Sequence, residues 1–119
     1  MQTHQALNGR VEVFKPSERL VGGPETDELV SAAKRLAATG KLALLIDLDD
    51  VTYINSLGLG AFTRMIAVAS QAGGAVKICN IKGRVRELFD VVRFNILFEY
   101  HDSEDAALQA FAKEMTTKV

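Results

Sequence analysis

A short, nearly continuous apolar run over residues 42–48 is the feature that most constrains the fold of this chain. The run reads Leu-Ala-Leu-Leu-Ile-Asp-Leu, far below the ~18 apolar residues that a membrane span needs. A strand this uniformly apolar is typical of one buried on both faces, in a sheet covered by helices. The run therefore predicts an α/β domain, and a chain of 119 residues is long enough to build one core without a disulfide or metal.

Strand-like and helix-like segments alternate along the chain. The patterns predict strands at 11–14, 19–21, 42–48, 75–81 and 96–100, and helices at 25–39, 57–72, 83–92 and from about residue 103 onward. This order predicts a single domain with a mixed or parallel central sheet of about four to five strands, covered by about four helices. We expect residues 1–8 to be a disordered or poorly packed lead-in, residues 9–115 to form the domain, and residues 116–119 to be a tail.

Composition excludes several classes of function. The chain carries 14 basic and 15 acidic residues, for a net charge of -1, and it lacks the basic excess that nucleic-acid binding uses. One cysteine and two histidines, His4 and His101, are too few for a disulfide framework or a Cys/His metal centre. The polar N-terminus has no signal-like apolar region. We expect a soluble cytoplasmic protein without cofactor, metal or membrane insertion.

The sharpest motif is Asn-Ser-Leu-Gly-Leu-Gly at residues 55–60, which opens the predicted helix 57–72. The first turn of a helix presents free backbone N–H groups that favour anions, and glycines let a ligand approach the backbone. The alternative is that Asn55 or Ser56 is simply an N-cap and the glycines permit tight packing. The spacing matches neither the dinucleotide-binding glycine motif nor a P-loop.

The helix predicted at 57–72 is apolar nearly all round. Arg64 is its only charged residue between Ser56 and Gly73. Such a helix is either deeply buried or offers one face to a partner.

Residues 42–60 resemble the central segment of STAS domains, and they are most similar to the anti-sigma factor antagonists. The resemblance continues through Gly73-Gly74, residues 76–79 and residues 85–90, and it spans roughly residues 9–112. It implies a STAS-like α/β fold and a role in partner switching, in which the antagonist binds an anti-sigma factor that is also a serine kinase. Phosphorylation beside the start of the central helix breaks such a complex, since it places about two negative charges in a packed interface.

The chain departs from the family motif at the phosphorylated position. The family reads Asp-Ser-Ser/Thr-Gly-Leu-Gly, which aligns its aspartate with Asn55, its first serine with Ser56 and its phospho-acceptor with Leu57. A second family aspartate, near the first helix, falls on Gly22 or Gly23. The resemblance then implies a constitutive antagonist, a protein whose acceptor has moved to Ser56, or another STAS role.

We expect the contact surface to centre on this loop. Leu57 is expected to be partly exposed, because a kinase must reach the family's acceptor. The phospho-acceptor-like loop comprises Asn55, Ser56, Leu57 and Gly58, and the expected partner contacts are Leu57, Leu59, Gly60, Ala61, Arg64 and Arg86.

The expected partner is a kinase-type anti-sigma factor. One alternative is a scaffold or sensor subunit that packs against copies of itself or other STAS proteins. Another is an accessory subunit of a lipid-transport complex.

Three aspartates, Asp47, Asp49 and Asp50, lie at the end of the buried strand. A receiver-type magnesium site would need an acidic pair on an earlier strand and a lysine at the end of a later one. Lys77 lies inside its strand, so we expect a solvated turn with one carboxylate facing out of the sheet.

Cys79 is predicted to be a core residue, and without a nearby histidine it is a poor nucleophile. We therefore expect no enzymatic activity. The basic residues around the helix 83–92 favour a solvated helix face, or else a docking edge for an acidic partner: Lys82, Arg84, Arg86 and Arg93.

Overall fold

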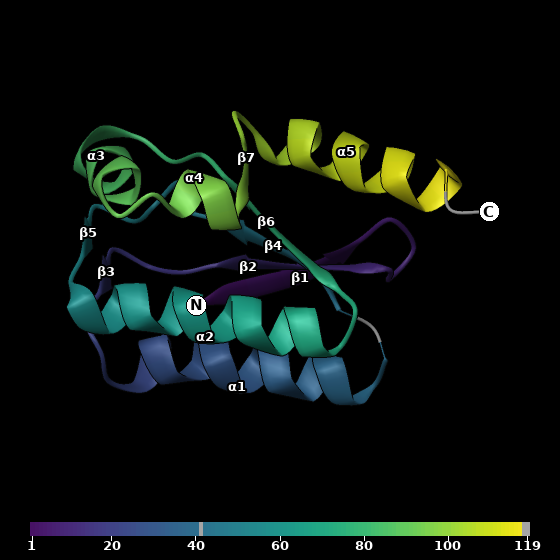
Figure 1. Ribbon diagram of the computed structural model, residues 1–119, viewed down its shortest axis with the longest axis horizontal. Coiled ribbons are helices and arrows are strands. Elements are labelled where there is room, and N and C mark those ends of the chain that lie inside the picture. Colours follow the sequence, from purple (N-terminus) through teal and green to yellow (C-terminus); the bar gives the residue numbers. More distant parts are fainter. Residues whose placement is uncertain (41, 118–119) are drawn as a thin grey trace.

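The computed structural model describes residues 1–40 and 42–117, in which helices pack on both faces of one sheet (Figure 1). The strands are β1 (Gln2–Ala6), β2 (Val11–Lys15), β3 (Arg19–Leu20), β4 (Ala43–Asp47), β5 (Tyr53–Ile54), β6 (Ala75–Cys79) and β7 (Glu99–His101). The helices are α1 (Pro24–Ala38), α2 (Ser56–Gln71), α3 (Gly83–Val91), α4 (Phe94–Leu97) and α5 (Glu104–Thr117).

The main sheet has five strands in the order β1-β2-β4-β6-β7. β1 is antiparallel to β2, and the other neighbouring strands are parallel. The sheet is therefore mixed, which confirms the predicted α/β class. β3 and β5 form a separate two-stranded parallel pair, which lies at the end of the molecule where α2 begins.

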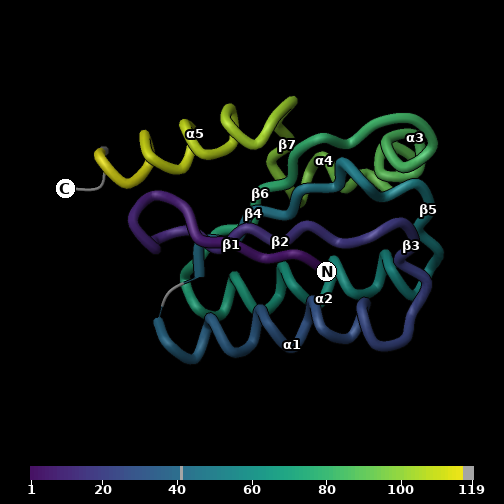
Figure 2. The backbone as a smooth tube through the Cα atoms, turned by 180° about the vertical axis from the view of Figure 1, so that it is seen from behind, coloured from purple at the N-terminus to yellow at the C-terminus, as the bar shows by residue number. Residues whose placement is uncertain are grey.

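The central strand β4 is buried on both faces, as its apolar run predicted. Leu44 and Ile46 face the larger core, which α1 and α2 cover from below in Figure 1. Leu45 faces a smaller cluster under α5, together with Val13 and Phe111. Figure 2 shows the same layers from behind, with α1 and α2 side by side on one face and α5 across the other.

Aromatic packing joins α2 to the segments that follow β6. The ring of Phe62 in α2 lies edge-on to Phe89 of α3, with centroids 5.4 Å apart, and edge-on to Phe98, at 6.0 Å. Such edge-to-face pairs add stability beyond the area they bury. They hold α2 against α3 and the segment before β7.

The N-terminal segment differs from expectation. Residues 2–6 form β1, the edge strand of the sheet, so the expectation of disorder was wrong, while the alternative of a poorly packed segment agrees with its mostly exposed side chains. The β1–β2 turn contains Asn8 and Gly9, both with positive φ, and Asn-Gly is a strong hairpin signal. β1 shows no hydrophobic alternation because its side chains are almost all exposed. Backbone pairing with β2 holds it in place.

The predicted strand at 96–100 was also wrong at its start. Ile96 and Leu97 belong to α4, and β7 begins only at Glu99. Arg93 has a left-handed φ of 60°, which ends α3 and starts a new helical turn. That turn brings Phe94 and Phe98 into the core together.

The C-terminal helix extends beyond residue 115, the predicted end of the domain. α5 continues through residues 116 and 117, which were expected to belong to the tail, and residues 118–119 lie outside the described residues. None of the helices in the described part of the chain is both long and apolar enough to span a membrane.

Candidate functional site

Asn55 caps the N-terminus of α2 and ties it to the loop after β3. Its Oδ1 accepts hydrogen bonds from the backbone N–H groups of Leu57 (3.0 Å) and Gly58 (3.1 Å), two of the groups that a helix start leaves free. Its Nδ2 donates to the carbonyl of Val21 at 3.2 Å. The N-cap interpretation is therefore confirmed for Asn55, and the amide contributes a donor that an aspartate would lack.

Gly58 allows the first turn of α2 to touch the β3–β5 pair. A Cβ at this position would lie 2.4 Å from the carbonyl oxygen of Leu20 and 2.7 Å from Cγ2 of Ile54. Both distances are far below van der Waals contact, so only glycine fits there. This glycine permits close packing within the protein, which is the second of the two roles the sequence left open.

Leu57 is the most exposed apolar side chain of the motif, at 60%. The expected exposure is confirmed. The side chain lies over Gly22 in the β3–α1 loop, where an added Cβ would be 2.7 Å from Leu57 Cδ1 and 3.3 Å from its Cβ. Leu57 therefore packs against the backbone of Gly22, where no side chain intervenes.

The remaining predicted contact residues divide by exposure. Ser56 and Arg64 are exposed, while Leu59 and Gly60 are half-buried. Ala61 is fully buried. Its inclusion among the partner contacts was wrong, because it lies on the core side of the amphipathic helix.

Arg86 is exposed on α3. Its guanidinium lies over the ring of Tyr100 in β7, 6.0 Å from the centroid. This places the side chain on the α3–β7 side of the molecule.

Sequence reasoning missed the contribution of β5. Tyr53 is 47% exposed, and the guanidinium of Arg19 lies 4.7 Å from its ring centroid, since the two residues are register partners in the β3–β5 pair. The signal was present in Val51-Thr-Tyr-Ile, a β-branched and aromatic run. We use the name α2-start surface for Ser56, Leu57, Tyr53 and Arg19.

A family model described as the STAS domain matches residues 13–107 of this chain. The chain belongs to the STAS domain family. Its fold shows the layers and mixed sheet that the resemblance implied, and Ser56 and Leu57 of the α2-start surface belong to the motif at residues 55–60.

Two relatives of this STAS domain are named as antagonists. A Bordetella bronchiseptica protein, "Putative anti-sigma factor antagonist BtrV", is 27% identical over 92 residues, which cover 77% of this chain and 79% of that protein. The anti-sigma-B factor antagonist of Bacillus subtilis is 30% identical over 66 residues, which cover 56% of this chain and 61% of that protein. These relatives support an antagonist role for the domain.

Solved structures share the fold at lower identity. An anti-sigma factor antagonist from Mycobacterium paratuberculosis has a TM-score of 0.72 at 22% identity and covers 92% of each chain. The unphosphorylated form of the antagonist SpoIIAA has a TM-score of 0.70 at 12% identity and covers 99% of this chain and 98% of that one. Both likenesses confirm the STAS fold.

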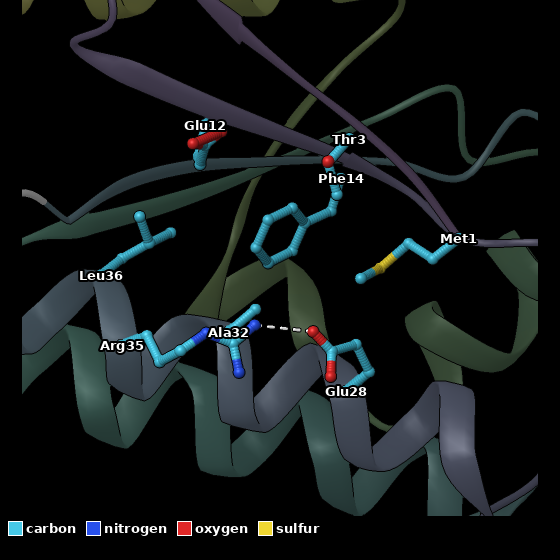
Figure 3. A pocket seen from close by; sticks show the side chains of 8 residues that line it. All are labelled: Met1, Thr3, Glu12, Phe14, Glu28, Ala32, Arg35 and Leu36. Carbon is cyan, nitrogen blue, oxygen red and sulfur yellow. Dashed lines mark hydrogen bonds and ion pairs between the residues drawn. The ribbon is translucent and has the colours of Figure 1, made fainter.

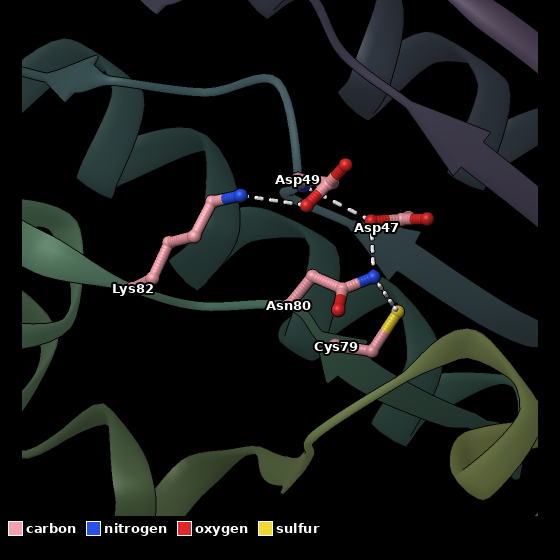
Figure 4. Close-up of polar contacts among 5 residues, drawn as sticks. All are labelled: Asp47, Asp49, Cys79, Asn80 and Lys82. Atoms are coloured by element: carbon pink, nitrogen blue, oxygen red, sulfur yellow. Dashed lines mark hydrogen bonds and ion pairs between the residues drawn. The ribbon is translucent and has the colours of Figure 1, made fainter.

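Asp47, the last residue of β4, and Asp49, two residues later, belong to one hydrogen-bond network in this STAS domain (Figure 4). Asp47 is only 4% exposed, and its Oδ1 accepts from Asn80 Nδ2 (2.9 Å) and from the backbone N–H of Asp49 (3.0 Å). Asp49 and Asp50 are exposed, as expected for a solvated turn, whereas the carboxylate of Asp47 is buried in this network and does not face solvent. Among the described residues, no group of three His, Cys, Asp or Glu side chains is placed to hold a metal ion.

Asp49 contacts a lysine across the same edge of the sheet. Lys82 Nζ lies 2.7 Å from Asp49 Oδ1, and this hydrogen bond lowers the pKa of Asp49. The side chains of both residues are about half exposed or more, so the pair contributes little to stability.

Cys79 has a histidine neighbour that the sequence did not reveal. His101 is its register partner on β7, and Asp47 is its partner on β4. Burial, followed by the charges of Asp47 and Glu104, raises the pKa of the Cys79 thiol to about 12. The thiol stays protonated near neutral pH, and it is unsuited to nucleophilic attack because the thiolate is the reactive form.

A recess between the β1–β2 edge and α1 is the pocket in Figure 3. Phe14 and Leu36 are among its apolar lining residues, and a 2.7 Å ion pair between Glu28 and Arg35 lies at its helix side. Its volume of about 240 Å³ is below the roughly 300–1,000 Å³ that small-molecule sites occupy.

Proposed function

We propose that this STAS domain is an anti-sigma factor antagonist that binds an anti-sigma factor of the serine-kinase class through the α2-start surface. The observation that carries the proposal is the exposure of Leu57, which is 60% accessible to solvent. It lies in the first turn of α2, where the resemblance aligns the family's phospho-acceptor. The two antagonist relatives support the same role.

The affinity would come from apolar anchors. Burying an exposed leucine is worth about 1.5–3 kcal/mol, and a few such residues dominate most interfaces. Tyr53, with the guanidinium of Arg19 over its ring, would add a second anchor in the strand pair that precedes α2. This is a binding role, and the protonated thiol of Cys79 offers no support for a catalytic one.

The complex is expected to persist in the presence of ATP. Leu57 has no hydroxyl group, so a kinase partner has no acceptor at this position. Ser56 is exposed one residue earlier, but successive helical residues point about 100° apart. A kinase site shaped for residue 57 would therefore reach Ser56 poorly.

The test is a titration of this protein against kinase-type anti-sigma factors from its own genome, first with ADP and then with ATP, followed by native mass spectrometry. A complex that survives ATP without added phosphate supports the constitutive antagonist. If the complex dissociates as one phosphate is added, and Ser56→Ala abolishes both effects, Ser56 is the phospho-acceptor. The absence of any complex with these partners would contradict the proposal.

A scaffold role is the second candidate, because a separate apolar group is exposed on α3 and α4. Val91 is 77% and Ile96 is 72% exposed. These residues would suit packing against copies of this chain or other STAS proteins. Light scattering over a range of protein concentrations tests it, and a mass that stays monomeric would argue against self-assembly. Association with a membrane-transport complex would instead support the lipid-transport alternative.

A further inference from the structure

The side chain of Leu57 packs against the backbone of Gly22, in the loop between β3 and α1. We call this backbone surface at Gly22 the seat of Leu57. Gly22 in this loop has a φ of +91°. A Cβ there would lie 2.7 Å from Leu57 Cδ1 and 3.3 Å from Leu57 Cβ. The loop and the start of α2 lie together at one end of the molecule (Figures 1 and 2).

We propose that Gly22 is a positioning residue for the partner interface: it seats the Leu57 side chain in one orientation, ready for an apolar recess on the anti-sigma factor. This inference rests on the proposed function, and it adds a residue outside the α2 motif together with the chemistry of the partner's recess.

Hydrogen bonds hold the seat on both sides. The N–H of Gly22 donates to Thr26 Oγ1 at 3.0 Å, and Thr26 is buried in α1. The carbonyl of the preceding Val21 accepts from Asn55 Nδ2 at 3.2 Å. The loop is thus tied to α1 and to the cap of α2, so the position of the seat relative to Leu57 is set by the same contacts that start both helices.

A side chain at position 22 would displace the leucine. Turning the outer part of Leu57 relieves the contact at Cδ1, but the 3.3 Å approach to its Cβ remains. The leucine would then leave its seat and sample several rotamers. Restricting a side chain before binding increases affinity, because less conformational entropy is lost on association.

The seat and the leucine are both uncharged, as is Asn55, and the first turn of α2 contains no acidic residue. The contribution of Leu57 to binding should therefore be apolar. It should depend little on ionic strength, in contrast to interactions between exposed charges.

The chain offers a matched control for this seat. Gly23 has a φ of +90°, and a Cβ there would meet nothing within 4 Å. Both glycines have a φ near +90°, so alanine strains the backbone at either position, but only Gly22→Ala would touch Leu57. A comparison of the two variants therefore separates strain from seating.

The experiment measures Leu57 in the free protein and the Kd of its complex with the anti-sigma factor. We expect Gly22→Ala, and not Gly23→Ala, to shift the NMR signals of the Leu57 methyl groups. Gly22→Ala should bind about two- to tenfold more weakly than Gly23→Ala. In a Leu57→Ala background the difference between the two glycine variants should vanish, as in a double-mutant cycle.

The proposal would be overturned by unchanged Leu57 methyl signals in Gly22→Ala, or by an equal loss of affinity for the anti-sigma factor in the two glycine variants. If no anti-sigma factor binds the unaltered protein, the proposed function fails and the interface role of Gly22 fails with it. The methyl signals of the free protein then still decide whether Gly22 positions Leu57.

Discussion

Gly58 and Gly60 lie two residues apart in α2 but have very different surroundings. A Cβ on Gly58 would collide with the backbone of β3, whereas the nearest atom to one on Gly60 is the flexible end of Arg64 at 3.5 Å. The first glycine is required by tertiary packing. The second costs helix stability without an evident packing reason.

We predict opposite effects of alanine at these two positions. Gly58→Ala should lower the free energy of unfolding by about 1–3 kcal/mol, the usual effect of overpacking. Gly60→Ala should raise it by roughly 0.5–1 kcal/mol, because alanine is the better helix former. Urea denaturation of both variants makes the measurement. A stabilised Gly58→Ala protein would show that α2 does not approach β3 as closely as described.

At the scale of elements, α5 is joined to the sheet through a buried lysine. The side chain of Lys77 in β6 is 2% exposed, with its Nζ 2.5 Å from Glu99 Oε2 and 2.7 Å from Glu114 Oε2. It also lies 4.9 Å from the ring centroid of Phe111 in α5. Burial lowers the pKa of Lys77, but the hydrogen bonds with Glu114 and Glu99 outweigh it and leave the pKa raised. The lysine therefore stays charged at neutral pH.

The lysine also makes part of the stability depend on pH. Its hydrogen bond lowers the pKa of Glu99 below 4.5. A carboxylate with a lowered pKa contributes stability above its unfolded value, and that contribution is lost as the pH falls through the folded value. In Lys77→Met we expect a smaller loss of stability below about pH 4.5, measured by urea denaturation at a series of pH values.

The matched control is Lys34→Met, at an exposed position of α1, which should keep the acid dependence of the unaltered protein. Both glutamates are about half exposed and regain water when the lysine is removed. Lys77→Met loses the stability that the two ion pairs contribute near neutral pH, and burial of the apolar methionine side chain offsets part of that loss. Identical acid dependence in Lys77→Met and the unaltered protein would contradict this account of α5.

At the scale of the whole molecule, the reactivity of Cys79, the only cysteine, reports how readily the folded protein opens. Cys79 is fully buried, in the small cluster between the sheet and α5. Its pKa of about 12 leaves almost no thiolate in the folded state. Reaction with an alkylating reagent therefore requires the protein to open.

We predict that iodoacetamide labels Cys79 slowly in native buffer and quickly in denaturing urea. The intact mass should show a single adduct, because the chain has one cysteine. The labelling rate should rise with urea in parallel with global unfolding. Rapid labelling at low urea, before the main transition, would show instead that α5 detaches on its own.

Expectations from the sequence succeeded where local patterns decide structure. The run at residues 42–48 identified β4, and Pro24 and Gly40 marked the limits of α1. The motif at residues 55–60 also revealed the Asn55 cap. Periodic apolar residues and capping residues act over one or two helical turns, so they are readable in a single sequence.

Expectations failed where partners distant in sequence decide structure. β1 has no apolar pattern of its own and exists because β2 pairs with it. The two-residue β5 depends in the same way on β3. Ile96 was assigned to a strand, but the left-handed Arg93 lets the chain place Phe94 and Phe98 in the core instead.

The sequence by itself determined the α/β class, the central buried strand, the capped helix after it, and an apolar residue in its first turn. The tertiary structure alone decided that Leu57 lies over Gly22, that Gly58 touches β3, and that His101 lies beside Cys79. The physical reason is the range of the interactions. Periodicity and capping are local, whereas a contact between distant segments depends on how the whole core brings them together.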